Sequence, residues 1–93
     1  MMAVRPVINK NVRFASRPEG AVLLQLDRGK YKTLNVTGRV IWDELCRGGT
    51  TDEVADALHA RYPTVPKTRI ENDLNAFLRE LERRGLISLE SDG

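Results

Sequence analysis

The sequence has few cysteines and histidines, and this shortage excludes several kinds of functional site. Cys46 is the single cysteine among 93 residues, which excludes an internal disulfide and a zinc site built on cysteines. His59 is the single histidine, and no serine–histidine–aspartate pattern accompanies it. We therefore expect a non-catalytic protein with no metal and no cofactor. In this interpretation Cys46 is a small buried thiol and His59 lies on a helix surface.

Long apolar runs and a strong excess of one charge are also missing. No run of 18 apolar residues occurs, and the N-terminal residues lack the apolar segment of a secretory signal. Fifteen basic and 13 acidic residues leave a net charge of +2, which is too small to indicate a nucleic-acid partner by itself. Together with the cysteine content, these features predict a soluble, cytoplasmic protein that binds neither a membrane nor nucleic acid.

Length and composition predict one folded domain over residues 1–93. Apolar residues make up 41% of the chain and charged residues 30%, as in ordinary globular proteins. A chain of this length has no room for a second core. Residues 1–10 show no clear periodicity of apolar residues and contain Pro6. These features predict an arm or a short leading strand. Residues 86–89 allow a brief terminal strand, and residues 90–93 are expected to form a frayed tail.

The N-terminal half carries the pattern of three antiparallel strands. Alternating apolar and polar residues predict strands that begin at Val12 and that cover Ala21–Leu26 and Tyr31–Asn35. Arg17-Pro18-Glu19-Gly20 and Asp27-Arg28-Gly29 supply turn residues between them. These short connections favour neighbouring, antiparallel strands.

Three helices are predicted in the C-terminal half, over residues 38–47, 51–62 and 66–84. Thr37 is the expected cap of the first helix. Thr50 and Glu53 match a capping box at the start of the second. Gly85 is expected to end the third in the left-handed conformation, with Leu86 folding back onto the helix. A small sheet followed by three helices predicts a winged-helix-like α+β fold.

The third helix is the longest and carries an apolar stripe. Its start is ambiguous, because Pro66 suits a first helical turn but Thr68 and Glu71 form a second capping-box pattern. Five basic and four acidic residues are interspersed along it, which is a poor match to DNA phosphates. A winged-helix DNA-binding regulator is therefore an alternative rather than the main hypothesis. The stripe consists of Ile70, Leu74, Phe77, Leu78 and Leu81.

The predicted third strand, Tyr31–Asn35, has no proline and is followed by helices that would form one wall of a groove. A sheet of three strands has free edges, which proteins either blunt or use for binding. We interpret this edge as the binding surface for a peptide that adds as a further strand, with apolar pockets giving specificity. The alternative is an edge that is covered or inert.

The segment LDRGKYKTLNVTGRVIW at residues 26–42 resembles the PqqD-like family, the recognition elements of pathways for ribosomally synthesised and post-translationally modified peptides. The resemblance extends over about residues 12–89. The resemblance also includes residues 49–54 and 85–87 and, on the third helix, Asp73, Leu74, Phe77, Leu78 and Leu81. These helical parts are generic. The most specific part of the resemblance is the LN-x-TG pattern at Leu34, Asn35, Thr37 and Gly38.

Membership in this family implies a winged-helix-like fold without catalytic activity. It also implies that the leader region of a precursor peptide binds as an extra antiparallel strand on the third strand, against the third helix. A basic leader residue would pair with Asp73. By this resemblance, the peptide-binding residues are Tyr31, Lys32, Thr33, Leu34, Asn35, Ile70, Asp73, Leu74 and Phe77.

Within the family, the GKYxxLNxTG pattern is most similar to the stand-alone leader-binding proteins of lasso-peptide pathways. The implied partners there are a cysteine-protease-like leader peptidase and a macrolactam-forming cyclase. The alternative is a peptide chaperone for a radical-SAM enzyme in pyrroloquinoline-quinone maturation. The loop before the third strand of that chaperone usually differs from the LDRG at residues 26–29.

Overall fold

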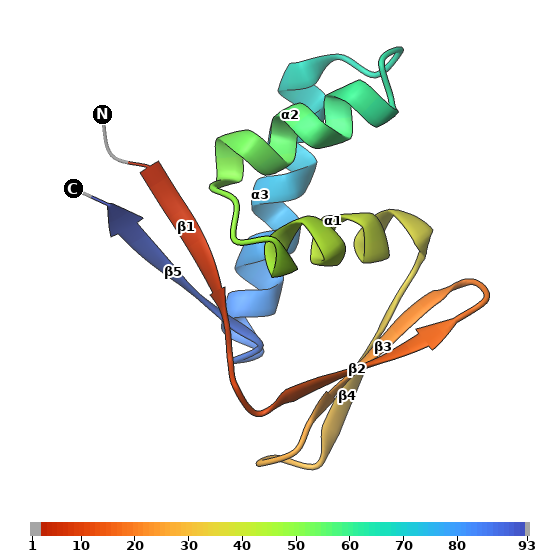
Figure 1. Cartoon of the computed structure of the whole chain (residues 1–93), viewed down its shortest axis with the longest axis vertical. Helices are drawn as coiled ribbons and strands as arrows, with labels where there is room; N and C mark the ends of the chain where they lie inside the picture. Colours follow the sequence, from red (N-terminus) through yellow and green to blue (C-terminus); the bar gives the residue numbers. More distant parts are fainter. Residues whose placement is uncertain (1–2, 93) are drawn as a thin grey trace.

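Two small antiparallel sheets and three helices make up the computed structural model, which describes residues 3–92 (Figure 1). The predicted α+β order, a three-stranded antiparallel sheet followed by three helices, is confirmed. The elements in order are β1 (Ala3–Ile8), β2 (Val12–Arg17), β3 (Gly20–Gln25), β4 (Lys30–Leu34), α1 (Val36–Cys46), α2 (Thr51–Arg61), α3 (Lys67–Arg83) and β5 (Ile87–Asp92).

The three-stranded sheet has the order β2-β3-β4, with β3 in the middle. Its inner face is set by Ala21, Leu23 and Gln25, which are all buried, whereas Leu24 on the opposite face is 40% exposed. The start of β3 requires a glycine. Gly20 has a φ of 146°, and a β-carbon there would lie 1.9 Å from the carbonyl oxygen of Leu34. Only a residue without a side chain fits this close approach.

Of the two expectations for residues 1–10, an arm or a short leading strand, the described part is a strand: it forms β1 and pairs with β5. Pro6 does not prevent this pairing. The amide of Asn9 donates to the carbonyl oxygen of Leu86 (3.0 Å), so these opposed residues form a hydrogen-bonded pair. Such pairs alternate along the strands, and the register therefore turns the nitrogen of Pro6 away from β5.

The prediction of a frayed tail over residues 90–93 is wrong as far as the structure describes these residues. Residues 90–92 belong to β5 and pair with residues 3–5 of β1. The remainder of both predictions, Met1, Met2 and Gly93, lies outside the described residues. The two ends of the described chain thus lie side by side in a two-stranded sheet (Figure 1).

Helix α1 begins two residues earlier than expected, because Asn35 rather than Thr37 is its cap. The side-chain oxygen of Asn35 accepts a hydrogen bond from the amide of Gly38 at 2.8 Å. Asn35 has an extended conformation, with φ −78° and ψ −177°, as N-cap residues usually have. Strand β4 consequently ends at Leu34, and Asn35 marks the transition from strand to helix.

Cys46 is exposed, so the prediction of a buried thiol is wrong. It follows the buried Leu45, and a step of one residue along a helix turns the side chain out of the core. Partial loss of water contact and the Asp43 carboxylate raise the pKa of the Cys46 thiol. A raised pKa disfavours the thiolate, which is the form needed for nucleophilic attack.

Helix α2 starts with the predicted capping box. The amide of Glu53 donates to the hydroxyl of Thr50, and the amide of Thr50 donates to the Glu53 carboxylate at 2.9 Å. The hydrogen bonds from Thr50 lower the pKa of Glu53. Both bonds satisfy amides that would otherwise have no partner at the helix start.

Helix α3 starts at Lys67, with Pro66 as a cap residue that offers no side-chain hydrogen bond. The second capping-box pattern, at Thr68, therefore lies inside the helix. The end of α3 is as predicted: Gly85 has a φ of 78°, and the amide of Leu86 donates to the carbonyl oxygen of Leu81 at 2.9 Å.

The core lies between the helices and the inner faces of both sheets. Trp42 of α1 is 3% exposed and belongs to it, whereas Phe77 of α3 packs at its margin and is only partly buried. The buried core residues are Ala21, Leu23, Leu34, Ile41, Trp42, Leu45, Val54, Ala55, Leu58, Ile70, Leu74, Leu78, Leu81, Leu86 and Ile87.

Candidate functional site

Strand β4 forms an open edge of the three-stranded sheet, because β3 is its single strand partner among residues 3–92. The amide of Leu26 donates to the carbonyl oxygen of Asn11 (3.0 Å), which makes these opposed residues a hydrogen-bonded pair. Bonded and non-bonded pairs alternate across antiparallel strands. The register therefore turns the N–H and C=O groups of Tyr31 and Thr33 away from β3 and toward the open edge.

A groove of about 530 Å³ runs between β4 and α3. Eight of the nine residues predicted for the site line it, namely Lys32, Thr33, Leu34, Asn35, Ile70, Asp73, Leu74 and Phe77. Tyr31 is the exception. Its side chain is 67% exposed and lies on the other face of β4 from Lys32. The structure thus brings most of the predicted residues together around one hollow.

The floor of the groove is the outer layer of the core. Leu34, Ile70 and Leu74 line it but are nearly fully buried, so they present little surface to a ligand. Phe77 is only partly buried and offers more apolar surface. Leu34 is therefore a core residue first, and its contribution to binding is limited to the shape of the floor.

The sequence analysis did not predict the part of the groove that is lined by residues after α2. Tyr62 and Val65 line this part of the groove and are partly buried against the core. The signal was present in the sequence, because both apolar residues stand next to the helix-breaking Pro63 and Pro66. The other lining residues that were not predicted are Thr37, Gly38, Ile41, Leu58, Arg69 and Glu80.

Ion pairs border the groove. Lys32 of β4 donates to the carboxylate of Glu80 of α3 at 3.3 Å, which connects the two walls. The bond from Lys32 lowers the pKa of Glu80 and keeps this carboxylate ionised. Asp73, expected to pair with a basic leader residue, lies 3.8 Å from Arg69 on the same helix. Both of these side chains are well exposed, so the pair is weak and exchangeable.

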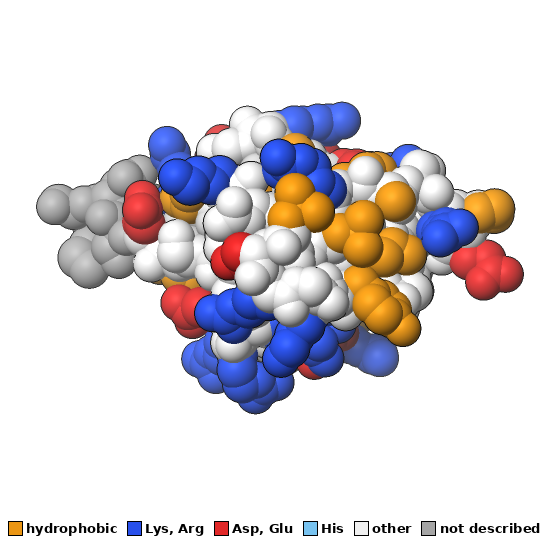
Figure 2. Space-filling model, turned by 90° about the horizontal axis from the view of Figure 1, so that it is seen from below, with side chains coloured by type: hydrophobic (Ala, Val, Ile, Leu, Met, Phe, Trp, Pro, Cys, Tyr) orange, Lys and Arg blue, Asp and Glu red, His pale blue; other side chains and the backbone are white. Residues whose placement is uncertain are grey.

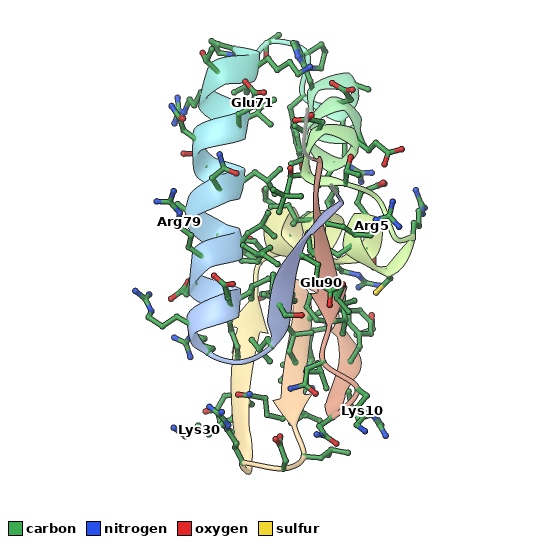
Figure 3. All side chains as sticks on the ribbon, turned by 90° about the vertical axis from the view of Figure 1, so that its left-hand side faces the viewer. Arg5, Lys10, Lys30, Glu71, Arg79 and Glu90 are labelled. Carbon is green, nitrogen blue, oxygen red and sulfur yellow. The ribbon has the colours of Figure 1, made fainter. Side chains whose placement is uncertain are left out.

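A second pocket, of about 430 Å³, lies beyond the Lys32–Glu80 pair, between the start of β4 and the C-terminal end of α3. Figure 3 shows Lys30 at the start of β4, below the last turn of α3. Four cationic side chains line the pocket and no carboxylate does. Its lining residues are Gln25, Arg28, Gly29, Lys30, Tyr31, Arg83 and Arg84. We call it the basic pocket.

The peptide groups of Tyr31 and Thr33 and the apolar groove beside them give the site the chemistry of a binding surface. Among residues 3–92, no group of three or more histidine, cysteine, aspartate or glutamate side chains is placed to hold a metal ion. Within the same residues, no helix combines the length and apolar character that crossing a membrane requires. Open peptide groups beside an apolar hollow are suited to hold an extended chain.

Comparison with known proteins gives consistent matches. The family model described as coenzyme PQQ synthesis protein D (PqqD) matches residues 20–87. A solved structure of TbiB1 in complex with the TbiA(beta) leader peptide is 35% identical, with a TM-score of 0.83, and the alignment covers 88% of this chain and 94% of that one. A lasso peptide synthetase B1 complexed with the leader peptide is 29% identical, with a TM-score of 0.81 and coverage of 89% and 96%. No curated protein sequence matched the chain.

Proposed function

Because the chain belongs to the PqqD family, we propose that it binds the leader region of a ribosomally made precursor peptide. The leader would add as an antiparallel strand to β4 and lie against α3. The observation that carries the proposal is the pair of peptide groups, at Tyr31 and Thr33, that face the open edge directly beside the groove. The binding of leader peptides by both solved neighbours supports it.

The register makes the binding mode specific. A guest residue opposite Tyr31 or Thr33 would exchange hydrogen bonds with that residue, giving up to four main-chain bonds of about 1 kcal/mol each, net. The one guest residue between these positions would stand opposite Lys32 and turn its side chain toward α3. One well-buried apolar anchor there contributes about 1.5–3 kcal/mol. After the cost of ordering the peptide, these terms give micromolar to nanomolar affinity.

The groove also defines what the leader has to supply. Its floor is apolar, whereas its rim carries the Arg69–Asp73 and Lys32–Glu80 pairs. An apolar leader side chain would cover Phe77, the partly buried part of the floor. A basic leader residue would compete with Arg69 for Asp73 at the rim.

We place the protein in lasso-peptide biosynthesis as a non-catalytic, cytoplasmic adaptor. It would present the bound leader to a cysteine-protease-like leader peptidase and to a macrolactam-forming cyclase. The description of one solved neighbour as a lasso peptide synthetase B1 supports this pathway over a radical-SAM enzyme of pyrroloquinoline-quinone maturation. Co-purification of the protein with each class of enzyme, with and without a leader peptide, distinguishes the two pathways.

The binding mode is tested with Thr33→Pro, which removes one of the two amides that face the open edge and leaves the β3 side of β4 intact. Thr33→Ala keeps this amide and is the matched control. We expect fluorescein-labelled TbiA(beta) leader peptide to bind the wild type and Thr33→Ala, and to bind Thr33→Pro at least tenfold more weakly in anisotropy titrations. No saturable binding by the wild type, or equal binding by a folded Thr33→Pro, contradicts the proposal.

A further inference from the structure

The basic pocket continues the groove by one helical turn but differs from it in charge. Arg83 and Arg84 approach it from the end of α3. Arg28 approaches it from the β3–β4 connection and Lys30 from the start of β4. The Lys32–Glu80 pair lies between the groove and the pocket. A strand that follows β4 past Lys32 therefore passes from an apolar environment into a cationic one.

The cations of the pocket are largely uncompensated. Glu80 is the acidic residue that ion-pairs with them, at 3.6 Å from Arg84, and it is shared with Lys32. Among residues 3–92, Arg28, Lys30 and Arg83 form no ion pair, although the charge of Arg83 contributes to the lowered pKa of Glu80. The helix dipole accounts for arginines in the last turn of α3. It does not account for Arg28 and Lys30, which come from a different part of the chain.

The two sides of the pocket are held together. The Arg28 guanidinium carbon lies 3.5 Å from where a β-carbon on Gly85 would stand, so this side chain lies close over the end of α3. The buried Gln25 donates its side-chain amide to the carbonyl oxygen of Arg84 at 2.8 Å. These contacts fix the β3–β4 connection against the helix end, so the convergence of positive charge is a property of the fold.

We propose that the basic pocket binds a short acidic segment of the guest peptide, directly C-terminal to the residues paired with β4. This inference rests on the proposed function, because an antiparallel guest reaches Lys30 with its C-terminal end. Aspartate or glutamate side chains would form charge-assisted hydrogen bonds to the lysine and arginines. The acidic segment fixes the register of the guest, since a shifted strand would place its carboxylates beside Glu80 instead.

The test uses a displayed library of random linear peptides panned on the wild-type protein. Clones that bind the wild type and Thr33→Ala but not Thr33→Pro are the edge-dependent ones. Among them we expect aspartate and glutamate to be enriched on the C-terminal side of the paired segment. An absence of edge-dependent clones overturns the proposed function itself, whereas edge-dependent clones without acidic enrichment overturn only the basic-pocket assignment.

One enriched peptide then serves as a synthetic probe. Lys30→Gln and Arg83→Gln should each lower the affinity for this peptide three- to tenfold. An analogue of the peptide with asparagine in place of aspartate should bind the wild type with the same reduced affinity. Neither substitution in the protein should reduce the affinity for this analogue any further. Arg79→Gln is the control, because Arg79 points away from both hollows (Figure 3). Equal affinities of the peptide and its analogue overturn the proposal. The proposal is also overturned if a labelled DNA duplex displaces the peptide and if binding of the duplex depends on Lys30 and Arg83.

Discussion

The ammonium nitrogen of Lys32 on β4 lies 3.3 Å from a carboxylate oxygen of Glu80 on α3, and this contact divides the apolar groove from the basic pocket. The Lys32 side chain is 16% exposed and that of Glu80 36%, so the pair is only partly shielded from water. Because one partner comes from each wall, the contact also fixes the distance between the strand and the helix.

Replacing Glu80 by glutamine should slightly lower the urea midpoint of unfolding at neutral pH. The hydrogen bond from Lys32 holds the pKa of Glu80 below its ordinary value, so the folded state favours the ionised form. This stabilisation is present above the unfolded-state pKa of about 4.3 and is lost as the pH falls through the lower folded-state pKa. Urea midpoints of the two proteins, measured from neutral pH to about pH 3, should therefore converge in acid.

Glu82→Gln is the matched control for this measurement. Glu82 stands on the same helix and makes no recorded ion pair within residues 3–92. Its replacement should leave the pH dependence of the midpoint close to that of the wild type. If Glu80→Gln and the wild type differ equally at every pH, the Lys32 contact does not stabilise the fold in solution.

Phe77→Ala should weaken binding of the TbiA(beta) leader peptide about tenfold or more, which corresponds to about 1.4 kcal/mol of lost anchor burial. Phe77 is the partly buried aromatic residue of the groove. Phe14→Ala is the control, because Phe14 stacks on Arg39 at 5.3 Å outside the groove. Anisotropy titrations measure both. Leu34→Asp is unsuitable here, since a charge at this buried position is expected to unfold the protein.

Gly20→Ala should destabilise the protein by about 2 kcal/mol or more, because its β-carbon would collide with the Leu34 carbonyl oxygen at the end of β4. Gly48→Ala is the comparison. Gly48 also has a positive φ, of 79°, but no atom lies within 4 Å of where its β-carbon would stand. Its replacement should therefore cost only the backbone strain, about 1 kcal/mol. Chemical denaturation gives both values, and equal losses would show that the close contact is relieved elsewhere.

Thr50→Ala should destabilise the protein by about 1 kcal/mol, because the amide of Glu53 loses its capping partner. Thr50→Ser keeps the hydroxyl and should remain close to the wild type. The pKa of Glu53, followed by NMR titration, should rise only part of the way toward its ordinary value in Thr50→Ala, because the variant keeps the hydrogen bond from the backbone amide of residue 50, the larger cause of the lowered pKa, and loses that of the hydroxyl. An unchanged pKa would show that the Thr50 hydroxyl does not help to lower it.

Exposed apolar side chains lie on the outer side of the three-stranded sheet. Figure 2 shows apolar and basic side chains together on the underside of the molecule, where this sheet is located. By register, Leu24 and Tyr31 are cross-strand neighbours there, and Leu26 is 58% exposed. Because apolar residues occur on both faces of β3, the sequence pattern predicts that both faces are partly covered. In the structure the face of Leu23 is buried, whereas Leu24 on the other face is 40% exposed.

Much of the local structure could be predicted from the sequence. The Thr50–Glu53 capping box and the Gly85–Leu86 helix ending are correct, because each depends on a few consecutive residues. The errors have local causes too. Asn35 competes with Thr37 as a cap and is the stronger of the two. Residue type predicts a buried Cys46, whereas its position on the helix turns the side chain outward.

The sequence alone determined the order of strands and helices, the turns between them and a resemblance that places the binding residues on one strand and one helix. Short-range hydrogen bonding and steric restrictions are sufficient for these features. Tertiary structure decided which strand edge stays open and which of the predicted site residues are buried in the core. It also decided which cationic side chains line the basic pocket. Lys32 and Glu80 are 48 residues apart, and β1 pairs with β5 across almost the whole chain. Contacts of this kind depend on how distant elements pack, and no local pattern encodes that packing.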